Sequence, residues 1–380
     1  MSSAAAQRSG AADGSVRVAV LTRVDFWRSG AGHRARIAAL LDSLLGIGEV
    51  TLVWLSHFEP EDLAQIRTRW PHLRLHALEL PQQGERSGAL AALAAFFAAH
   101  PQHACIVEYL ELFWLRPAVP RGVLCLVDTH DVVSERDRAL VEAGVSIGRS
   151  VINPAQEAER LGVFDVVMAI SPADAATFAR WVVPGRVLLV PHAQPASATP
   201  LPAGQNVLFV GSAYAPNLIG LGWFLREVWP RLDAAGAELH VVGDAGPALE
   251  LSSGPRLHVH GRLADLGPAY RQARVCINPV SMGSGLKIKT VEALAHARPL
   301  VTTTHGARGL ENAAGRAFVV ADTPDAFAQA IAALLSDDER AATLAAAAGA
   351  WAERTLSPAS SHGPLLRLVR QWAARGSEPK

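Results

Sequence analysis

The sequence predicts an α/β protein built from two doubly wound domains, in which helices cover both faces of a parallel sheet. Short apolar runs alternate with amphipathic stretches through most of the 380 residues, which is the pattern of parallel strands joined by crossover helices. A proline-rich interruption lies near the middle, and the same alternation restarts after it. At roughly 150 residues per domain, the length also fits two domains.

The first half, residues 16–190, is expected to form the N-terminal domain. Its strands are predicted at residues 16–21, 50–55, 74–78, 104–108, 123–128, 163–170 and 187–190. Residues 30–45 are predicted to be a loop and a helix, because apolar side chains recur there at helical spacing, and residues 89–99 form another helix. Residues 1–15 are an Ala/Ser/Gly-rich leader, which is expected to be disordered and lacks the apolar core of a signal peptide.

The second half is expected to repeat this architecture after a linker at residues 191–205, where four prolines exclude a helix or a central strand. The C-terminal domain is predicted over residues 206–355, with strands at 206–210, 238–242, 257–260, 275–279, 299–303 and 316–320 and helices at 218–235, 286–297, 325–335 and 339–351. Residues 356–380 should hold a last helix that packs back on the N-terminal domain. Two such domains leave a cleft at the carboxyl ends of their strands, where ligands bind in doubly wound folds.

The charge balance, the cysteines and the hydropathy limit the class of function. The 35 Lys and Arg residues equal the 35 Asp and Glu residues, so no nucleic-acid partner is expected. The three cysteines lack both a disulfide framework and metal-ligand spacing, and they are predicted to be buried thiols. The apolar stretch at residues 88–99 is shorter than the ~20 residues that span a bilayer, which leaves only a peripheral membrane contact open. We therefore expect a cytoplasmic protein, with a contact at the inner face of the membrane as an open alternative.

The most informative segment follows a predicted strand in the second half. A Gly-Ser-Gly turn at residues 283–285 precedes a helix expected to begin at Leu286, and Lys287 and Lys289 lie in its first turn. The only other lysine of the chain is Lys380. A helix start attracts phosphate through its unpaired amides and its dipole, whereas lysines there oppose the dipole. The two lysines therefore predict a bound anion, with Lys289 in closest contact and Lys287 acting through its field; a solvated helix start is the alternative.

Glu292 lies one turn beyond Lys289 on the same predicted helix. A carboxylate accepts two hydroxyl hydrogen bonds, which suits the 2′,3′-diol of a ribose. An ion pair with Lys289 within the helix is the alternative, and both can hold together. In the first half, Gly32 belongs to a glycine-rich loop after the first strand, which predicts contact with a diphosphate or an acceptor, or else a plain tight turn.

These segments resemble family-4-type glycosyltransferases of the GT-B fold, the glycosyl transferases of group 1 that use sugar nucleotides in exopolysaccharide and cell-envelope assembly. The most specific match is Gly-Ser-Gly-Leu-Lys-Ile-Lys-Thr-Val-Glu-Ala-Leu-Ala at residues 283–295. Residues 207–217, 223–230 and 239–243 are also similar, as are residues 127–136 and 169–171. The resemblance covers nearly the whole chain and implies two Rossmann-like domains that face each other across a cleft.

The resemblance implies a retaining glycosyltransferase that moves a sugar from a UDP- or GDP-sugar to a saccharide or lipid-linked acceptor, with no metal or other cofactor. The departing phosphate takes the acceptor's proton, so no pair of catalytic carboxylates is required. His130 is placed near the donor sugar and Arg262 near the nucleobase; a local bond from His130 to Asp131 and a structural role for Arg262 are the alternatives. The expected catalytic residues are His130, Lys289 and Glu292. The expected donor-binding residues are Gly32, Gly211, Ser212, Asn217, Gly243, Arg262, Ser284, Gly285, Leu286, Lys287, Lys289 and Glu292.

The sequence departs from the family pattern at two places. Many members carry two glutamates eight positions apart; Glu292 matches the second, whereas Ser284 stands at the first. The Arg and Lys that bind the diphosphate in many members are replaced by Ser212 and Asn217, so the two lysines of the predicted helix are expected to supply that charge. Three alternatives follow: a catalytically weakened protein that binds nucleotide sugars or scaffolds an assembly, a sugar-nucleotide epimerase with carboxylates in the cleft, and a two-domain binding protein of the periplasmic type, which the lysine-bearing loop disfavours.

Overall fold

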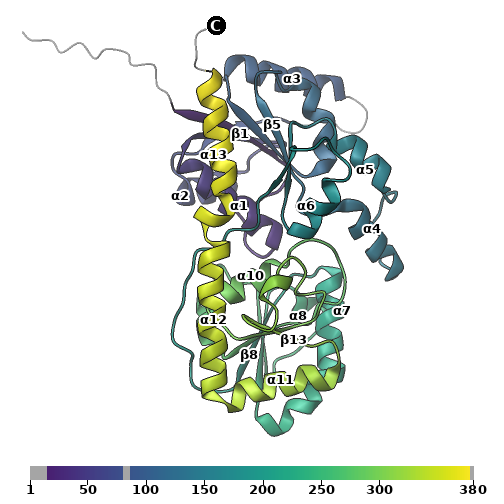
Figure 1. The fold of residues 1–380 in the computed structure, drawn as a ribbon, viewed down its shortest axis with the longest axis vertical. Coiled ribbons are helices and arrows are strands. Elements are labelled where there is room, and N and C mark those ends of the chain that lie inside the picture. The colour runs from purple at the N-terminus through teal and green to yellow at the C-terminus, as the bar shows by residue number, and fades with distance from the viewer. Residues whose placement is uncertain (1–14, 80–85, 377–380) are drawn as a thin grey trace, which may run out of the picture.

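Two parallel sheets, each flanked by helices, lie one above the other in the computed structural model (Figure 1). The structure describes residues 15–79 and 86–376, so the predicted leader lies outside the described residues except for Ser15. The N-terminal sheet has seven strands in the order β3-β2-β1-β4-β5-β6-β7, and the C-terminal sheet has six in the order β10-β9-β8-β11-β12-β13. This confirms the predicted α/β class with two doubly wound domains, because in each sheet the strand order runs outward in both directions from a central strand.

The N-terminal domain contains the elements β1 (Val16–Thr22), α1 (Gly32–Leu45), β2 (Gly48–Trp54), α2 (Pro60–Arg69), β3 (Arg74–Ala77), α3 (Arg86–Ala99), β4 (Ala104–Glu108), η1 (Leu110–Ala118), β5 (Leu124–Asp128), α4 (Val133–Glu142), α5 (Pro154–Leu161), β6 (Val166–Ala169), α6 (Pro172–Phe178) and β7 (Val187–Leu189). The strands are fully apolar where both faces are covered, as in parallel sheets generally. On β4, for example, Cys105 packs towards the side of α3 and Ile106 towards the side of α1.

The C-terminal domain contains β8 (Asn206–Val210), α7 (Ala215–Trp223), η2 (Phe224–Val228), η3 (Trp229–Ala235), β9 (Glu238–Val242), α8 (Ala245–Ala248), β10 (Leu257–Gly261), α9 (Gly267–Gln272), β11 (Val275–Asn278), α10 (Ile288–Ala295), β12 (Leu300–Thr302), η4 (Glu311–Ala313), β13 (Val319–Val320), α11 (Pro324–Ser336) and α12 (Asp338–Leu356). Helices α9, α10 and α12 cover one face of its sheet, and α7, η2, η3 and α11 cover the other.

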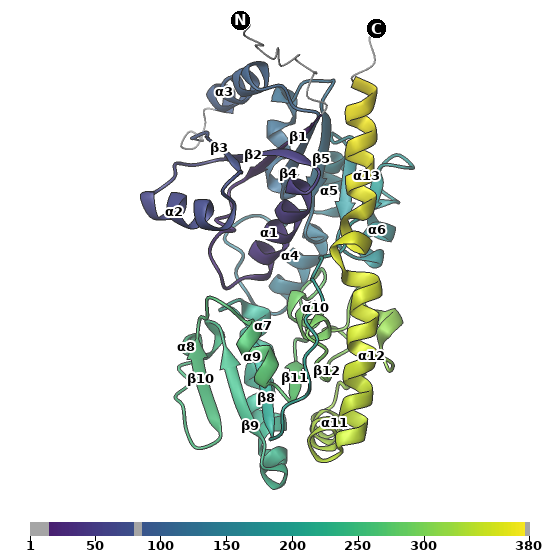
Figure 2. The ribbon, with the colours of Figure 1, turned by 90° about the vertical axis from the view of Figure 1, so that its left-hand side faces the viewer.

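The last helix, α13 (Pro358–Gly376), returns to the N-terminal domain. It follows α12 along one side of the molecule and lies beside the N-terminal sheet, whereas α12 lies beside the C-terminal one (Figure 2). Leu365, Val369 and Ala373 are buried in the core layer under α1. His362 Nδ1 is also 2.7 Å from the Ser43 hydroxyl of α1, so the end of the chain holds the two domains together.

One predicted helix is interrupted. Residues 218–235 form an α-helix, a π-helical turn and a 3₁₀ segment in succession instead of one α-helix. The change falls at Pro230, which has no N–H to donate and whose ring excludes the carbonyl of the preceding turn. The π-helical turn η2 ends where this 3₁₀ segment begins.

The expectations for the cysteines agree with the structure. Cys105, Cys125 and Cys276 are buried free thiols. In helix α3, Leu93, Phe96 and Phe97 are buried in the core of the N-terminal domain. Within the described ranges, no helix combines the length and the hydropathy needed to cross a bilayer.

Candidate functional site

The loops at the carboxyl ends of both sheets meet at the boundary between the domains. Gly285, which follows β11, lies so near the loop after β5 that an added Cβ would be 2.8 Å from the backbone oxygen of His130. Gly32, the first residue of α1, faces Ile288 of α10 equally closely, because an added Cβ would lie 2.8 Å from its Cγ1. Both predicted glycine loops therefore serve a close approach of the two domains.

The loop before α10 determines where that helix begins. Gly283 and Gly285 have φ values of 94° and 68°, in the left-handed region that favours glycine. Lys287 is extended and forms the N-cap, so α10 begins at Ile288 rather than at the predicted Leu286. Lys289 consequently lies in the first turn, as expected for a residue that meets an anion at a helix start.

Each of the two lysines has a different role in this loop. Lys287 Nζ donates hydrogen bonds to the carbonyl oxygens of Ser284 at 2.8 Å and Gly285 at 3.0 Å, so it holds the turn in shape. Lys289 Nζ donates to Asn217 Oδ1 at 2.6 Å and lies 4.5 Å from the centre of the Phe209 ring. Burial lowers the pKa of Lys287 to about 8 and that of Lys289 to about 7. Within the described residues neither ammonium group pairs with a carboxylate, and such a site favours an anionic ligand.

Glu292 faces the same region from the next turn of α10. Its carboxylate accepts a hydrogen bond of 2.8 Å from the Tyr270 hydroxyl of α9, and burial raises its pKa to about 7. The alternative ion pair with Lys289 is not formed, because Lys289 bonds to Asn217 instead. Tyr270 was not predicted, since nothing in its sequence context links it to a residue on another helix.

The predicted residues after β8 and β9 lie against each other. An added Cβ on Gly243, whose φ is 97°, would lie 2.3 Å from the backbone oxygen of Gly211. The Asn217 side chain donates to the carbonyl oxygen of Ser212 at 3.0 Å and accepts from Lys289. Asn217 thus joins the loop after β8 to the start of α10.

The remaining predicted donor residues differ in what they offer. Arg262 is exposed and donates to Asp244 Oδ2 at 2.5 Å, and its side chain lies against Gly30 of the other domain. The Leu286 side chain is buried in the core, so only its backbone can meet a donor. Ser284 Oγ is buried and has no hydrogen-bond partner among the described residues, which leaves a hydroxyl free in the loop.

His130 is the predicted residue of the other domain that comes closest to this loop. Its φ of 61° is unusual for a residue with a side chain, and its ring stacks on that of Tyr109 with centroids 4.0 Å apart. Its Nε2 lies 2.7 Å from Glu108 Oε2. The alternative local bond to Asp131 is not formed, because the Asp131 carboxylate accepts from Arg136 at 3.1 Å.

Two buried carboxylates surround His130. Arg36 donates to both oxygens of Asp128, at 2.6 and 2.8 Å. Burial opposes ionisation of Asp128, but the guanidinium of Arg36 outweighs it and lowers the pKa. Burial and the neighbouring Asp128 raise the pKa of Glu108. Glu108, Asp128 and His130 are close enough to hold a metal ion, but these polar contacts already occupy their ligand atoms.

Two cationic side chains that the sequence left without a role also lie here. Arg308 pairs with Glu135 across the domain boundary, and His305 Nε2 lies 2.5 Å from the carbonyl oxygen of Gly283. Both line a cavity of about 710 Å³ beside the Gly-Ser-Gly loop, which Trp223 and Arg226 also line. No spacing in the sequence indicates these contacts, because they depend on how the domains meet.

Comparison with solved structures decides the fold. Sucrose-phosphate synthase from Thermosynechococcus elongatus superposes with a TM-score of 0.68 at 18% identity, covering 95% of this chain and 100% of that one. Anabaena Alr3699/HepE in complex with UDP and glucose gives 0.66 at 13% identity, covering 94% and 100%. The chain has the GT-B fold.

The sequence comparisons agree with the resemblance. Residues 204–337 match the family model described as "Glycosyl transferases group 1", and this segment coincides with most of the C-terminal domain that carries the lysines. An "Uncharacterized 44.6 kDa protein in cps region" of Klebsiella pneumoniae is 30% identical over 139 residues, or 33% of this chain. The chain matches 36% of the length of that relative. These findings confirm the resemblance to GT-B glycosyltransferases of group 1.

Proposed function

We propose that the chain is a retaining glycosyltransferase that transfers a sugar from a UDP-sugar to a saccharide or lipid-linked acceptor during synthesis of a surface polysaccharide. The observation that carries the proposal is the pair of lysines at the start of α10, which have no carboxylate partner among the described residues and lie beside Glu292. The complex of Anabaena HepE with UDP and glucose supports a UDP-sugar, and the cps region of the Klebsiella relative supports the polysaccharide.

In this proposal the donor lies across the start of α10. The diphosphate replaces Asn217 Oδ1 as the partner of Lys289 and accepts from the free amides of the first turn. Glu292, held by Tyr270, accepts from the ribose hydroxyls, and the base lies towards Arg262. Gly285 and Ser284 bring the loop backbone and a hydroxyl towards the sugar, next to His130.

The reaction breaks the bond between the anomeric carbon and the diphosphate oxygen, and the electron pair leaves with the diphosphate. The acceptor hydroxyl oxygen bonds to the anomeric carbon from the same face, and its proton passes to the departing phosphate oxygen. Charge builds up on that phosphate in the transition state, so Lys289 and the α10 amides act where stabilisation is worth most. In this scheme the charge is supplied by side chains rather than by a metal ion. Contacts between His130 and the donor sugar would hold the sugar for attack.

Binding and turnover experiments test the proposal. Calorimetry with UDP, GDP and ADP should show one site per chain that prefers UDP. Turnover of UDP-sugars with saccharide acceptors should release UDP, and NMR of the product should show the anomeric configuration of the donor. If none of the three nucleotides bound, the transferase assignment would be wrong; an inverted product would exclude the retaining mechanism.

A catalytically weakened binding or scaffolding protein is the second candidate. Ser284 and Ser212 stand where many family members carry charged side chains, and this observation favours it. Such a protein binds UDP without turning over any UDP-sugar. An epimerase differs from both, because it changes the sugar nucleotide in the absence of an acceptor. The same assays, run with and without acceptor, therefore separate the three candidates.

A further inference from the structure

A second group of ligand-type side chains lies on the C-terminal domain, away from the proposed donor site. Strand β9 carries Glu238 and His240, and the edge strand β10 carries His258 and His260. Residues two apart on a strand point to the same face, and His258 is the register partner of His240. The four side chains therefore stand together on one face at the edge of the sheet.

The atoms of this group are close enough to share one ion. His258 Nε2 lies 3.2 Å from Glu238 Oε2. A ring nitrogen of His240, one of His258 and a carboxylate oxygen of Glu238 all lie within 4.8 Å of one another. Zn²⁺ binds such atoms at about 2.0–2.2 Å in tetrahedral geometry, which places its ligand atoms about 3.3 Å apart. Small side-chain rotations of these partly exposed residues close that difference.

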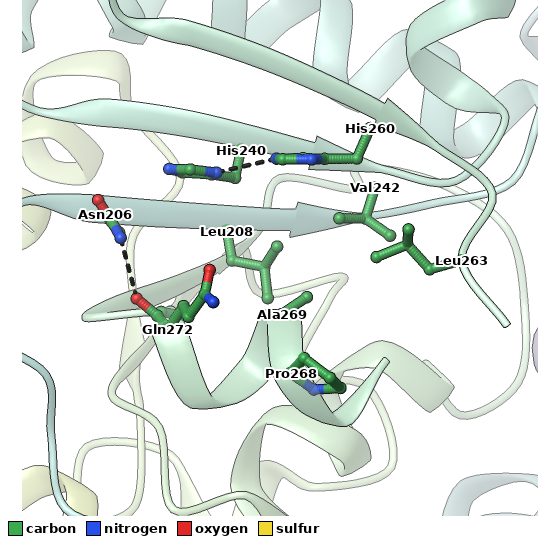
Figure 3. A pocket seen from close by; sticks show the side chains of 10 residues that line it. Asn206, Leu208, His240, Val242, His260, Leu263, Pro268, Ala269 and Gln272 are labelled. Atoms are coloured by element: carbon green, nitrogen blue, oxygen red, sulfur yellow. Dashed lines mark hydrogen bonds between the residues drawn. The ribbon is translucent and has the colours of Figure 1, made fainter. Parts of the chain in front are cut away.

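His240 has the hydrogen bonding of a metal-binding histidine. Its Nδ1 lies 2.9 Å from His260 Nε2, and the two rings lie side by side with the other ring nitrogen of His240 pointing away from His260 (Figure 3). That nitrogen, Nε2, is buried and has no hydrogen-bond partner within the described residues. Metal-binding histidines use one ring nitrogen for the ion and the other for a bond that orients the ring. Both rings border a cavity of about 110 Å³ between the sheet and α9, which leaves room for ring movement.

We propose that Glu238, His240 and His258 bind one divalent transition-metal ion of the zinc type, with His260 as the residue that orients His240. Two imidazole nitrogens and one carboxylate oxygen form a ligand set that zinc accepts and that magnesium and calcium disfavour. The ion cross-links the edge strand β10 to β9. Because β10 ends next to Arg262, the cross-link also steadies the loop that faces the N-terminal domain.

Zinc titration of the full chain, freed of any metal-binding tag, tests the proposal. Calorimetry should show one zinc ion per chain, and zinc should raise the midpoint of thermal unfolding, because an ion that binds only the folded state stabilises it. His240→Gln with His258→Gln should abolish both effects, and His260→Gln should weaken zinc binding by about 10- to 100-fold. His100→Gln is the matched control, since that ring lies near His76 on the other domain, and it should change nothing.

The outcomes that overturn the proposal are equally definite. Absence of stoichiometric zinc binding to the unaltered chain refutes the site. Zinc binding that persists in the double variant also refutes it, because the ion must then be held elsewhere. Glu238→Gln keeps the shape of the side chain and removes its charge, so an unchanged zinc affinity in this variant excludes the carboxylate as a ligand. Thermal unfolding of each variant without zinc shows whether the fold is intact.

Discussion

Replacing Lys289 by methionine removes the ammonium group and keeps a side chain of similar length over the Phe209 ring. If Lys289 Nζ donates to the diphosphate of UDP, the variant loses one hydrogen bond to a charged group. Such a bond contributes about 1.5–3 kcal/mol, so UDP should bind about 10- to 150-fold more weakly. The fold should remain intact, because the substitution removes a buried charge that pairs with no carboxylate of the described residues.

The pH dependence provides the sharper part of this prediction. The pKa of Lys289 lies at about 7, far below its ordinary value, whereas a bound diphosphate favours the protonated form. UDP therefore binds well below pH 7 and loses affinity as the pH rises. The protonated fraction falls from about one half at pH 7 to about one hundredth at pH 9, which weakens binding by about 50-fold if the bound lysine stays protonated.

Calorimetry with UDP between pH 6 and pH 9 measures both effects. Arg340→Met is the control, because it removes one cation from an exposed position of α12. It should leave the affinity and its pH dependence unchanged. The reasoning is refuted if Lys289→Met binds UDP as tightly as the unaltered chain, or if its affinity still falls above pH 7.

The remaining predictions concern other parts of the account. Glu292→Gln should weaken UDP about tenfold but leave binding of the 2′-deoxy nucleotide nearly unchanged, and it should abolish the loss of UDP affinity below pH 7, where the raised pKa of the glutamate neutralises it; equal losses for both nucleotides would contradict a ribose contact. Gly285→Ala should reduce turnover at least tenfold, whereas Gly148→Ala, at a similar φ of 65° but with open space around it, should not; equal effects would show that backbone strain alone acts. His130→Gln should lower kcat about 100-fold with UDP affinity unchanged, in a steady-state assay that a loss confined to KM would contradict. Leu365→Ala should lower the free energy of unfolding in urea by about 2–5 kcal/mol, and a change below 1 kcal/mol would contradict its burial beneath α1.

The fold was accessible from the sequence because each strand and helix has its own apolar pattern. The alternation predicted the strands of both sheets to within a few residues, including β8 at residues 206–210 and β9 at residues 238–242. The interruption at Pro230 was missed because the periodic apolar pattern continues through it. The start of α10 was placed two residues early, since the left-handed conformations of Gly283 and Gly285 cannot be read from residue type alone.

The candidate site was accessible only where its residues are neighbours in sequence. Lys287, Lys289 and Glu292 lie within one segment, and their grouping was visible at once. The partners of His130 and Glu292 were not, because they come from other elements: Glu108 reaches His130 through the pairing of β4 with β5. Tyr270 reaches Glu292 from α9.

The cluster on β9 and β10 escaped for the same reason. Glu238 and His240 form one short pattern, and His258 and His260 form another, but neither resembles a metal motif alone. They converge only because the two strands pair in a register that sets His258 beside His240. The sequence therefore led us to expect no metal, whereas the arrangement of the strands leads to a metal-site proposal.

A crystal structure of the chain with UDP tests the central claim most directly. We expect a diphosphate oxygen within about 3 Å of Lys289 Nζ, the ribose hydroxyls on Glu292, and the hydrogen bond from Lys289 to Asn217 broken. UDP bound at another place, or bound here while Lys289 still donates only to Asn217, would contradict the proposed donor site.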